Sequence, residues 1–200
     1  GGERCDRRQF PEPAKSEPAP DWPNQTLKAA IENMAQLTSY HLKAEIQAGP
    51  KPTLEGDLGP GTLSFHGDDK KGNKRQRRVV EGKFYISNDD GKTWGEDPDK
   101  ETTIGLSNMV TGPVSPVIKI WEKGTFTAKE VKVDGEDLLL LEKPAKGKEP
   151  AAFYWIVKDE KLKAIFIRKA SITIAADDAE FPIIVTYSKF NEPVEIKAPK

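Results

Sequence analysis

Few side chains in this sequence have the types and the spacing that catalysis requires. His41 and His66 are the only two histidines, and neither lies beside a serine or a cysteine in a nucleophile pattern. The paired aspartates fall at turn signals, where aspartate commonly closes the turn. No glycine-rich phosphate loop is present, and no spacing fits a zinc or an EF-hand site. The sequence therefore predicts no enzyme, no metal site and no cofactor.

The single cysteine, Cys5, can form neither a disulfide framework nor a cysteine metal site. It could be the acylated first residue of a bacterial lipoprotein, although Gly-Glu-Arg before it is not the small apolar context that such processing needs. An incidental thiol in a disordered segment is the simpler interpretation.

Residues 70–78 carry six positive charges in nine residues. Such a segment could contact anionic lipid headgroups or nucleic acid, but it lacks the interleaved aromatic residues that single-strand binding favours. A solvated edge hairpin, protected from further pairing by its charge, is the alternative. The net charge of −1 over 200 residues argues against nucleic acid as the main partner.

Residues 87–94, SNDDGKTW, resemble the Asp-box S-x-D-x-G-x-T-W of sialidase propeller blades. In those families the motif is a structural hairpin away from the active site. It occurs once here, whereas a propeller needs at least about four blades. The motif therefore predicts a hairpin over 83–95 and no glycosidase activity.

The elements that surround these residues alternate between one early helix and many short strands. Apolar residues spaced for one helical face predict an amphipathic helix of about fourteen residues that Asp21 or Asn24 caps, with Pro23 in its first turn. Alternation from Ser39 to Gln47 predicts a strand with one wet face. Further strands are predicted near 52–58, 62–67, 74–80, 82–88, 125–133, 136–142, 151–158, 161–169, 170–177, 181–189 and 193–198.

The connections between these strands are too short for parallel crossovers, so the sheet should be antiparallel. We expect an α+β fold in which a strongly curved sheet of about ten strands, a half-barrel, has helices on its concave face. The later strands are apolar on both faces, so either both faces are covered or one meets another subunit. Residues 1–23 are rich in proline and should form a disordered linker or tether, and residues 24–200 should form one domain.

One segment stands apart from the strands because it excludes charge. No residue from Thr102 to Val117 is charged, in a chain where 32% of residues are. Its apolar spacing predicts a short helix, a break at Gly112-Pro113, and a second helix near 114–122. We expect this helical insert, 102–122, to cover one face of the sheet, either tightly as a core or loosely over a pocket.

The order of parts resembles the exported lipoproteins of the LppX/LprG type and, more distantly, the lipoprotein carriers LolA and LolB. The resemblance depends on the closing phrase 187–199, YSKFNEPVEIKAP, and on the passage from the first helix into Ser-Tyr-His-Leu at 39–42. It implies a half-barrel of antiparallel strands whose concave side, closed by helices, binds acyl chains. It also implies attachment to a membrane through a lipid-modified N-terminal cysteine.

From these observations we expect a periplasmic or other extracytoplasmic binding module that holds a lipid or another apolar molecule between sheet and helices. The module could be anchored to the membrane as a lipoprotein. The alternative is a non-catalytic structural or interaction domain with a closed core, which dimerises or binds a protein. The sequence does not decide the oligomeric state. The residues predicted to contact the ligand are Leu27, Ile31, Met34, Tyr40, Leu42, Trp94, Ile104, Leu106, Met109, Val110, Val114, Val117, Ile118 and Trp121.

Overall fold

The computed structural model describes residues 21–47, 53–68, 72–176 and 179–200. Helix α1 (Trp22–Gln36) comes first, followed by strands β1 (Tyr40–Ile46), β2 (Thr53–Gly59), β3 (Thr62–Asp68), β4 (Lys74–Val80), β5 (Lys83–Ser87) and β6 (Gly95–Glu96). Helix α2 (Lys100–Thr111) then leads into three 3₁₀ turns, η1 (Gly112–Val114), η2 (Pro116–Ile118) and η3 (Ile120–Glu122). The chain ends with β7 (Thr127–Val133), β8 (Glu136–Lys143), β9 (Ala152–Asp159), β10 (Ala164–Ala176) and β11 (Ala179–Ser188).

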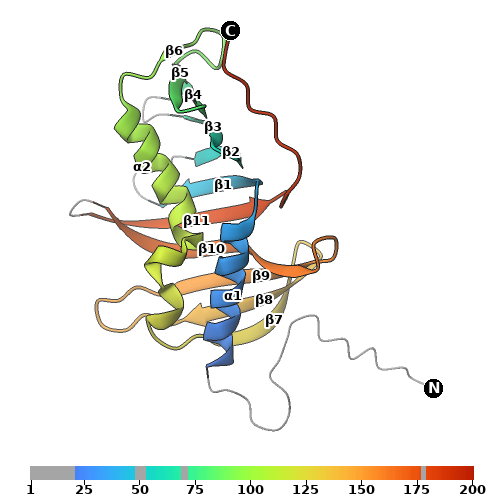
Figure 1. The fold of residues 1–200 in the computed structure, drawn as a ribbon. Helices are drawn as coiled ribbons and strands as arrows, with labels where there is room; N and C mark the ends of the chain where they lie inside the picture. Colours follow the sequence, from blue (N-terminus) through green and yellow to red (C-terminus); the bar gives the residue numbers. More distant parts are fainter. Residues whose placement is uncertain (1–20, 48–52, 69–71, 177–178) are drawn as a thin grey trace.

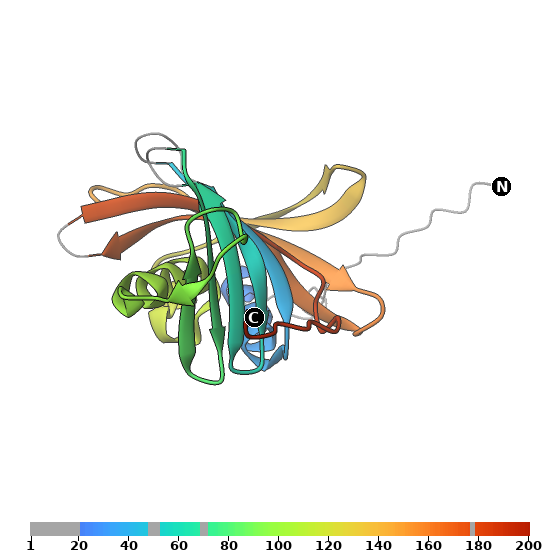
Figure 2. The ribbon, with the colours of Figure 1, turned by 90° about the horizontal axis from the view of Figure 1, so that it is seen from above.

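All eleven strands of the described residues form one antiparallel sheet in the order β6-β5-β4-β3-β2-β1-β11-β10-β9-β8-β7. The sheet consists of two meanders, and β1 joins them by pairing with β11, where Leu42 lies opposite Tyr187. Figure 2 shows that the sheet curves strongly and stays open. The predicted α+β class, the antiparallel pairing and the curved half-barrel are confirmed, with eleven strands where about ten were expected.

The strand order places β6 and β7 at opposite edges of the sheet, although they are neighbours in the sequence of strands. The segment that connects them must therefore cross the whole width of the sheet. It does so on the concave side, beside α1 (Figure 1). We call Lys100–Glu122, which comprises α2 and η1 to η3, the cover.

Helix α1 closes the second half of the concave face. Leu27, Ile31 and Met34 are buried there, and α1 packs mainly on β10. The Asn24 side chain fixes the start of α1 to the end of the cover, because its Nδ2 donates to the carbonyls of Trp121 (2.6 Å) and Gly124 (2.7 Å). Neither predicted side-chain cap forms. Asp21 occupies the N-cap position without a side-chain hydrogen bond to the helix, and the Asn24 side chain binds the cover instead.

The cover differs from its prediction at both ends. Helix α2 begins at Lys100, two residues before the expected start of the insert, with Asp99 as its N-cap. The second helix expected near 114–122 is replaced by the three 3₁₀ turns. Pro113 and Pro116 lack the N–H that a continuous helix needs, and Lys119 takes a left-handed conformation (φ 47°) that separates η2 from η3.

Near the C-terminus, one predicted break between strands and one predicted strand were wrong. The strands expected at 161–169 and 170–177 form the single strand β10, in which a register shift between Ile167 and Lys169 absorbs the irregularity. No strand forms at 193–198. This segment runs extended past the sheet (Figure 1), where Arg78 Nη1 donates to the Lys197 carbonyl at 3.3 Å, and Pro193 and Pro199 cannot donate to a ladder.

The residues described begin at Asp21, so Cys5 and most of the predicted linker, 1–23, lie outside them, while Trp22 and Pro23 already belong to α1. Within the described residues, no helix is long and apolar enough to cross a bilayer. The same residues contain no group of three or more histidine, cysteine, aspartate or glutamate side chains that could hold a metal ion.

On the outer face, the second half of the sheet carries a small core of its own. Leu138, Val157 and Phe166 are buried there, and Phe166 stacks on Phe190 with ring centroids 4.9 Å apart. Arg168 lies over the same Phe190 ring and forms two bonds to the Glu136 carboxylate, at 2.8 and 3.0 Å. The chain itself therefore covers part of the second apolar face that the sequence shows.

The Asp-box forms the predicted hairpin, with β5 and β6 paired through Tyr85–Glu96 and Ile86–Gly95. Asp89 closes it by accepting bonds from the Thr93 N–H (2.8 Å), the Thr93 hydroxyl (2.6 Å) and the Ser87 hydroxyl (2.8 Å). These hydrogen bonds, those from Thr93 first, lower the pKa of the Asp89 carboxyl to about 2.

The basic segment is not an edge hairpin, because β4 lies between β3 and β5. The positive side chains that the structure describes in this segment contact other residues of the fold. Arg77 is buried against Asp97, Arg78 stacks on Trp94 at 4.4 Å, and Lys74 lies 4.0 Å from Asp90. Lys70 and Lys71 lie outside the described residues.

His41 bridges two carboxylates on the outer face of β1 and β2. Its Nδ1 lies 2.8 Å from Asp57 Oδ1 and its Nε2 lies 2.8 Å from Glu55 Oε1. His66 is 3.7 Å from the second Glu55 oxygen. The hydrogen bond from His41 is the main cause that lowers the pKa of the Glu55 carboxyl, and the charges of His41, His66 and Lys43 act in the same direction.

The lowered pKa gives Glu55 a pH-dependent contribution to stability. Because the pKa of Glu55 is lower in the folded state, its stabilisation is present above the unfolded pKa and is lost as the pH falls through the folded pKa. Since Glu55 is partly exposed, we expect this contribution to the free energy of unfolding to be roughly 0.5 kcal/mol. When the pH is lowered from about 6 to about 3, the free energy of unfolding of the Glu55→Gln variant should therefore fall less than that of the parent. Urea unfolding at each pH measures this difference. Glu130→Gln, an exposed change on β7, is the control, and parallel losses in all three proteins would contradict the prediction.

Candidate ligand-binding site

The N-terminal end of α2 is anchored by a buried charged cluster that we call the Arg77–Asp97 cluster. Arg77 Nη1 of β4 donates to Asp97 Oδ2 and to the Thr103 hydroxyl oxygen, both at 2.8 Å. The Thr103 hydroxyl in turn donates to Asp97 Oδ2 at 2.7 Å. The side chain of Asp97 is 0% exposed and that of Arg77 8%. This buried, hydrogen-bonded ion pair connects the start of α2 to β4.

Two more bonds complete the anchoring at this end. Asp97 Oδ1 accepts the Asp99 N–H at 2.9 Å, and Asp99 caps α2 by accepting the Thr102 N–H at 3.1 Å and the Thr102 hydroxyl. The capping carboxylate satisfies a helix N–H that would otherwise have no partner. The hydrogen bonds from Thr102 are the main cause that lowers the pKa of the Asp99 carboxyl.

Two buried tyrosines hold the other end of α2. The Tyr187 hydroxyl donates to the Val110 carbonyl at 2.6 Å, and the Tyr154 hydroxyl donates to the Pro113 carbonyl at 2.7 Å. Burial raises the pKa of both phenols well above the usual value, and it raises the pKa of nearby Tyr40 to about 12. The two phenols are therefore neutral donors that satisfy carbonyls at the end of the helix.

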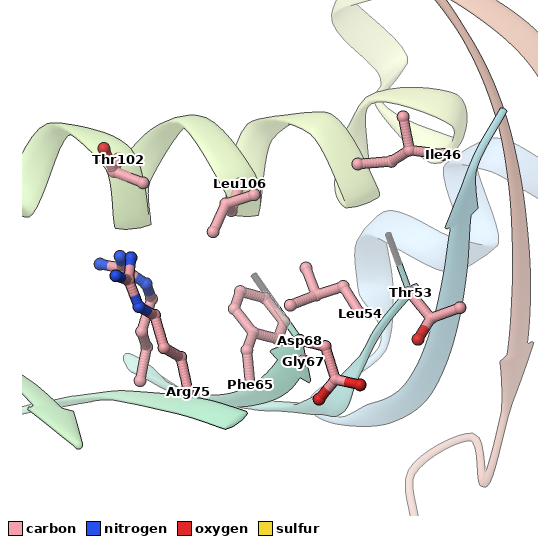
Figure 3. A pocket seen from close by; sticks show the side chains of 10 residues that line it. Ile46, Thr53, Leu54, Phe65, Gly67, Asp68, Arg75, Thr102 and Leu106 are labelled. Atoms are coloured by element: carbon pink, nitrogen blue, oxygen red, sulfur yellow. The ribbon is translucent and has the colours of Figure 1, made fainter. Parts of the chain in front are cut away.

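Between these two anchors a pocket of about 170 Å³ lies under the first half of α2. Figure 3 shows Leu106 pointing from α2 toward Phe65 and Leu54 on the sheet, and Arg75 extending toward the Thr102 end of the helix. Apolar side chains thus form the middle of the pocket, polar ones lie at its Thr102 end, and Ile46 lies with Thr53 at the other end. The lining residues are Ile46, Thr53, Leu54, Phe65, Gly67, Asp68, Arg75, Arg77, Thr102 and Leu106.

Two glycines shape the floor of the pocket. A Cβ on Gly56 would lie 2.6 Å from the Phe65 ring and 2.0 Å from the Ser64 carbonyl oxygen. A Cβ on Gly67 would lie 2.5 Å from the Thr53 carbonyl oxygen. The glycine at 56 therefore lets the ring of Phe65 lie across the neighbouring strand, where it forms the floor.

Most residues of the predicted ligand set lie elsewhere in the structure. Leu106 lines the pocket. The α1 residues Leu27, Ile31 and Met34 are buried in the other half of the core, as are Val114 and Trp121 of the cover. Tyr40, Leu42 and Val110 are buried without lining the pocket, and Met109 and Ile118 are half-buried. Ile104 and Val117 are exposed, and Trp94 lies in the Asp-box hairpin, where its Nε1 donates to the Gly91 carbonyl.

Ligand contact by this set stays a prediction, and the structure adds residues that the sequence did not single out. Leu54 and Phe65 were placed in predicted strands but not at a site. Their inward positions alternate with Glu55 and His66, which is the signal that could have found them. Arg77 was hidden within the basic segment, where nothing marks one arginine as buried.

An open curved antiparallel sheet whose concave face holds helices and an apolar pocket defines a recognisable class of fold. It is the fold of the lipoprotein LppX from Mycobacterium tuberculosis, whose crystal structure matches 90% of this chain and 100% of its own with a TM-score of 0.59 and 17% identity. LprF from Mycobacterium bovis matches 94% of this chain and 99% of its own, with a TM-score of 0.58 and 16% identity. No protein-family model and no curated protein sequence matches the chain.

Proposed function

We propose that this protein is a non-catalytic binding module of the cell envelope that holds an acyl chain between the first half of its sheet and α2. The observation that carries the proposal is the apolar pocket under α2, with Leu54, Phe65 and Leu106 around it. Binding sites for small molecules are mostly apolar, with a few polar groups at defined positions. Thr102 and Arg75 at one end supply such groups for the polar end of a lipid.

The size of the pocket decides what fits without a rearrangement. At about 170 Å³ it resembles a cavity of ~150 Å³ that accepts benzene, and it is smaller than the ~300–1,000 Å³ of ordinary ligand pockets. A short apolar segment fits the present arrangement. A longer chain requires the middle of α2 to move away from β2 and β3.

The packing of α2 is suited to such a movement. It buries only Thr103 and Val110 among its twelve residues, and both lie near an anchored end. Helix α1 in contrast buries six of its fifteen residues, including Leu27 and Ile31. Few buried apolar contacts mean a low cost of local opening, so α2 is the part of the concave face that can make room.

The similarity of fold supports the proposed location as well. LppX is a lipoprotein by name, and a lipoprotein fold with an apolar pocket favours an extracytoplasmic protein that meets lipids. Anchorage through an acylated Cys5 remains part of the proposal, with the alternative of an untethered domain.

A second candidate function rests on a different observation. Phe153 and Trp155 of β9 are half-buried on the outer face, stacked at 6.2 Å, with Lys169 4.9 Å from the Trp155 ring. Aromatic residues are enriched at protein interfaces, which favours the alternative of an interaction domain that uses its outer face. Sedimentation of the parent and of Trp155→Ser would separate the two functions, because only an interface would respond.

The test of the leading proposal is an organic extract of the purified protein, analysed by mass spectrometry. We expect a co-purifying lipid, and a rise in melting temperature when the delipidated protein is given a fatty acid. An extract without lipid, together with an unchanged melting temperature across acyl lengths, would overturn the proposal.

A further inference from the structure

The large aliphatic side chains that are strongly exposed among the described residues both belong to the cover. Ile104 of α2 is 47% exposed and Val117 of η2 is 86% exposed. Both elements lie in the helical layer on the concave side (Figure 1). Single exposed apolar residues are common on protein surfaces. Here, however, both lie on the one segment that crosses the sheet from edge to edge above the proposed ligand.

The surroundings of these two side chains are also unusual in charge. From Thr102 to Ile118 no residue is charged, although charged residues make up 32% of the chain. Burial explains only part of this, because about half a dozen members of the segment face solvent. These exposed and uncharged positions are Thr102, Ile104, Gly105, Asn108, Pro116 and Val117. Charges at such positions would cost nothing in water, so their absence fits a surface that leaves water when it acts.

We propose that the face of the cover that is turned away from the sheet docks on the surface of a lipid bilayer. Val117 and Ile104 would enter the boundary between headgroups and acyl chains. This inference rests on the proposed function, since it names the surface from which the site under α2 receives its lipid. Apolar residues buried at this boundary drive interfacial binding, and charged ones oppose it.

The ends of the uncharged segment suit this orientation. Lys100 and Glu101 precede it, and Lys119, Glu122 and Lys123 follow it. Lysine side chains reach from an apolar surface back to the headgroups. Three lysines against two glutamates leave a small positive balance, so anionic lipid should strengthen the docking only modestly.

A second copy of the chain is a poorer occupant of this face. Stable protein interfaces bury about 800 Å² on each partner and are enriched in aromatic anchors. The exposed positions of the uncharged segment include two large aliphatic residues and no aromatic one, and Trp121 of η3 is buried. Insertion into lipid needs only a few apolar side chains, because the lipid adapts its shape to them.

Flotation of the full chain, produced without acylation, with phosphatidylcholine vesicles and with vesicles that also contain phosphatidylglycerol tests the proposal. The parent should float with both kinds of vesicle. Val117→Asp and Ile104→Asp should each lower the vesicle partition coefficient by about tenfold or more, while Val117→Leu should retain it. Ala145→Asp, which adds the same charge at an exposed position outside the cover, should match the parent.

Each of the following outcomes decides whether the cover docks on a bilayer. Unchanged flotation of Val117→Asp, equal loss in Ala145→Asp, or no flotation of the parent overturns the proposal. So does a concentration-dependent dimer that Val117→Asp dissociates. Binding of a soluble fatty acid by Val117→Asp distinguishes the two hypotheses: retained binding with lost flotation confirms docking apart from the ligand site, and retained binding with unchanged flotation rejects docking while the proposed function stands.

Discussion

Replacing Asp97 with alanine should lower the free energy of unfolding by about 3–5 kcal/mol, the typical cost of leaving a buried charge without its partner. Asp97 has a fully buried side chain and accepts both Arg77 Nη1 and the Thr103 hydroxyl. Its removal leaves the Arg77 guanidinium buried and unpaired between β4 and α2. Equilibrium unfolding in urea measures the effect, provided that the transition is two-state.

The control for Asp97→Ala is the same substitution at Asp137, whose carboxylate is 62% exposed and lies 3.3 Å from Lys132. An exposed pair of this kind contributes no more than about 1 kcal/mol. The double variant Asp97→Leu with Arg77→Met should recover much of the loss, because it removes both charges together. Equal stabilities of Asp97→Ala and Asp137→Ala would show that the cluster does not stabilise the fold.

Replacing Leu106 with tryptophan should weaken the binding of an apolar ligand by about tenfold or more, through the volume that the indole takes from the pocket. Leu106 is the α2 side chain that faces Phe65 and Leu54 (Figure 3). The free energy of unfolding should change little, since the larger side chain enters a space that is already open. Titration with phenylnaphthylamine, an uncharged fluorophore, followed by displacement with a fatty acid, measures the affinity.

The matched control for Leu106→Trp lies on the same helix. Asn108 is exposed, does not line the pocket and is outside the predicted ligand set, so Asn108→Trp adds the same indole without filling the site. We expect parental affinity in this variant. Full binding by Leu106→Trp would place the ligand elsewhere in the molecule.

Local periodicity predicted the helix of α1 and most strands, because burial on one face imposes a period of 3.6 or of 2 on the sequence. It could not predict the strand order. The pairing of β1 with β11 joins residues as distant as Leu42 and Tyr187, and no local pattern marks that contact. The chain's crossing from one edge of the sheet to the other was therefore invisible until the order of strands was known.

The candidate site was only partly predictable for a related reason. The absence of charge identified the cover, and Gly112-Pro113 marked where its first helix ends. Periodicity tells which face of a helix is apolar, but not whether the opposing strands fill the space below it. That depends on Gly56, which admits the Phe65 ring, and on a pair such as Arg77 and Asp97, which are 20 positions apart.

The pairing of β1 with β11 also has a consequence for how the chain folds. The last strand must be synthesised before the first can complete its hydrogen bonds, so the nascent first meander exposes an unpaired edge along Tyr40–Ile46. Contacts of such large separation slow folding, and an open strand edge in a waiting intermediate invites pairing with other chains. A holding chaperone that shields β1 during this delay would therefore raise the yield of native protein.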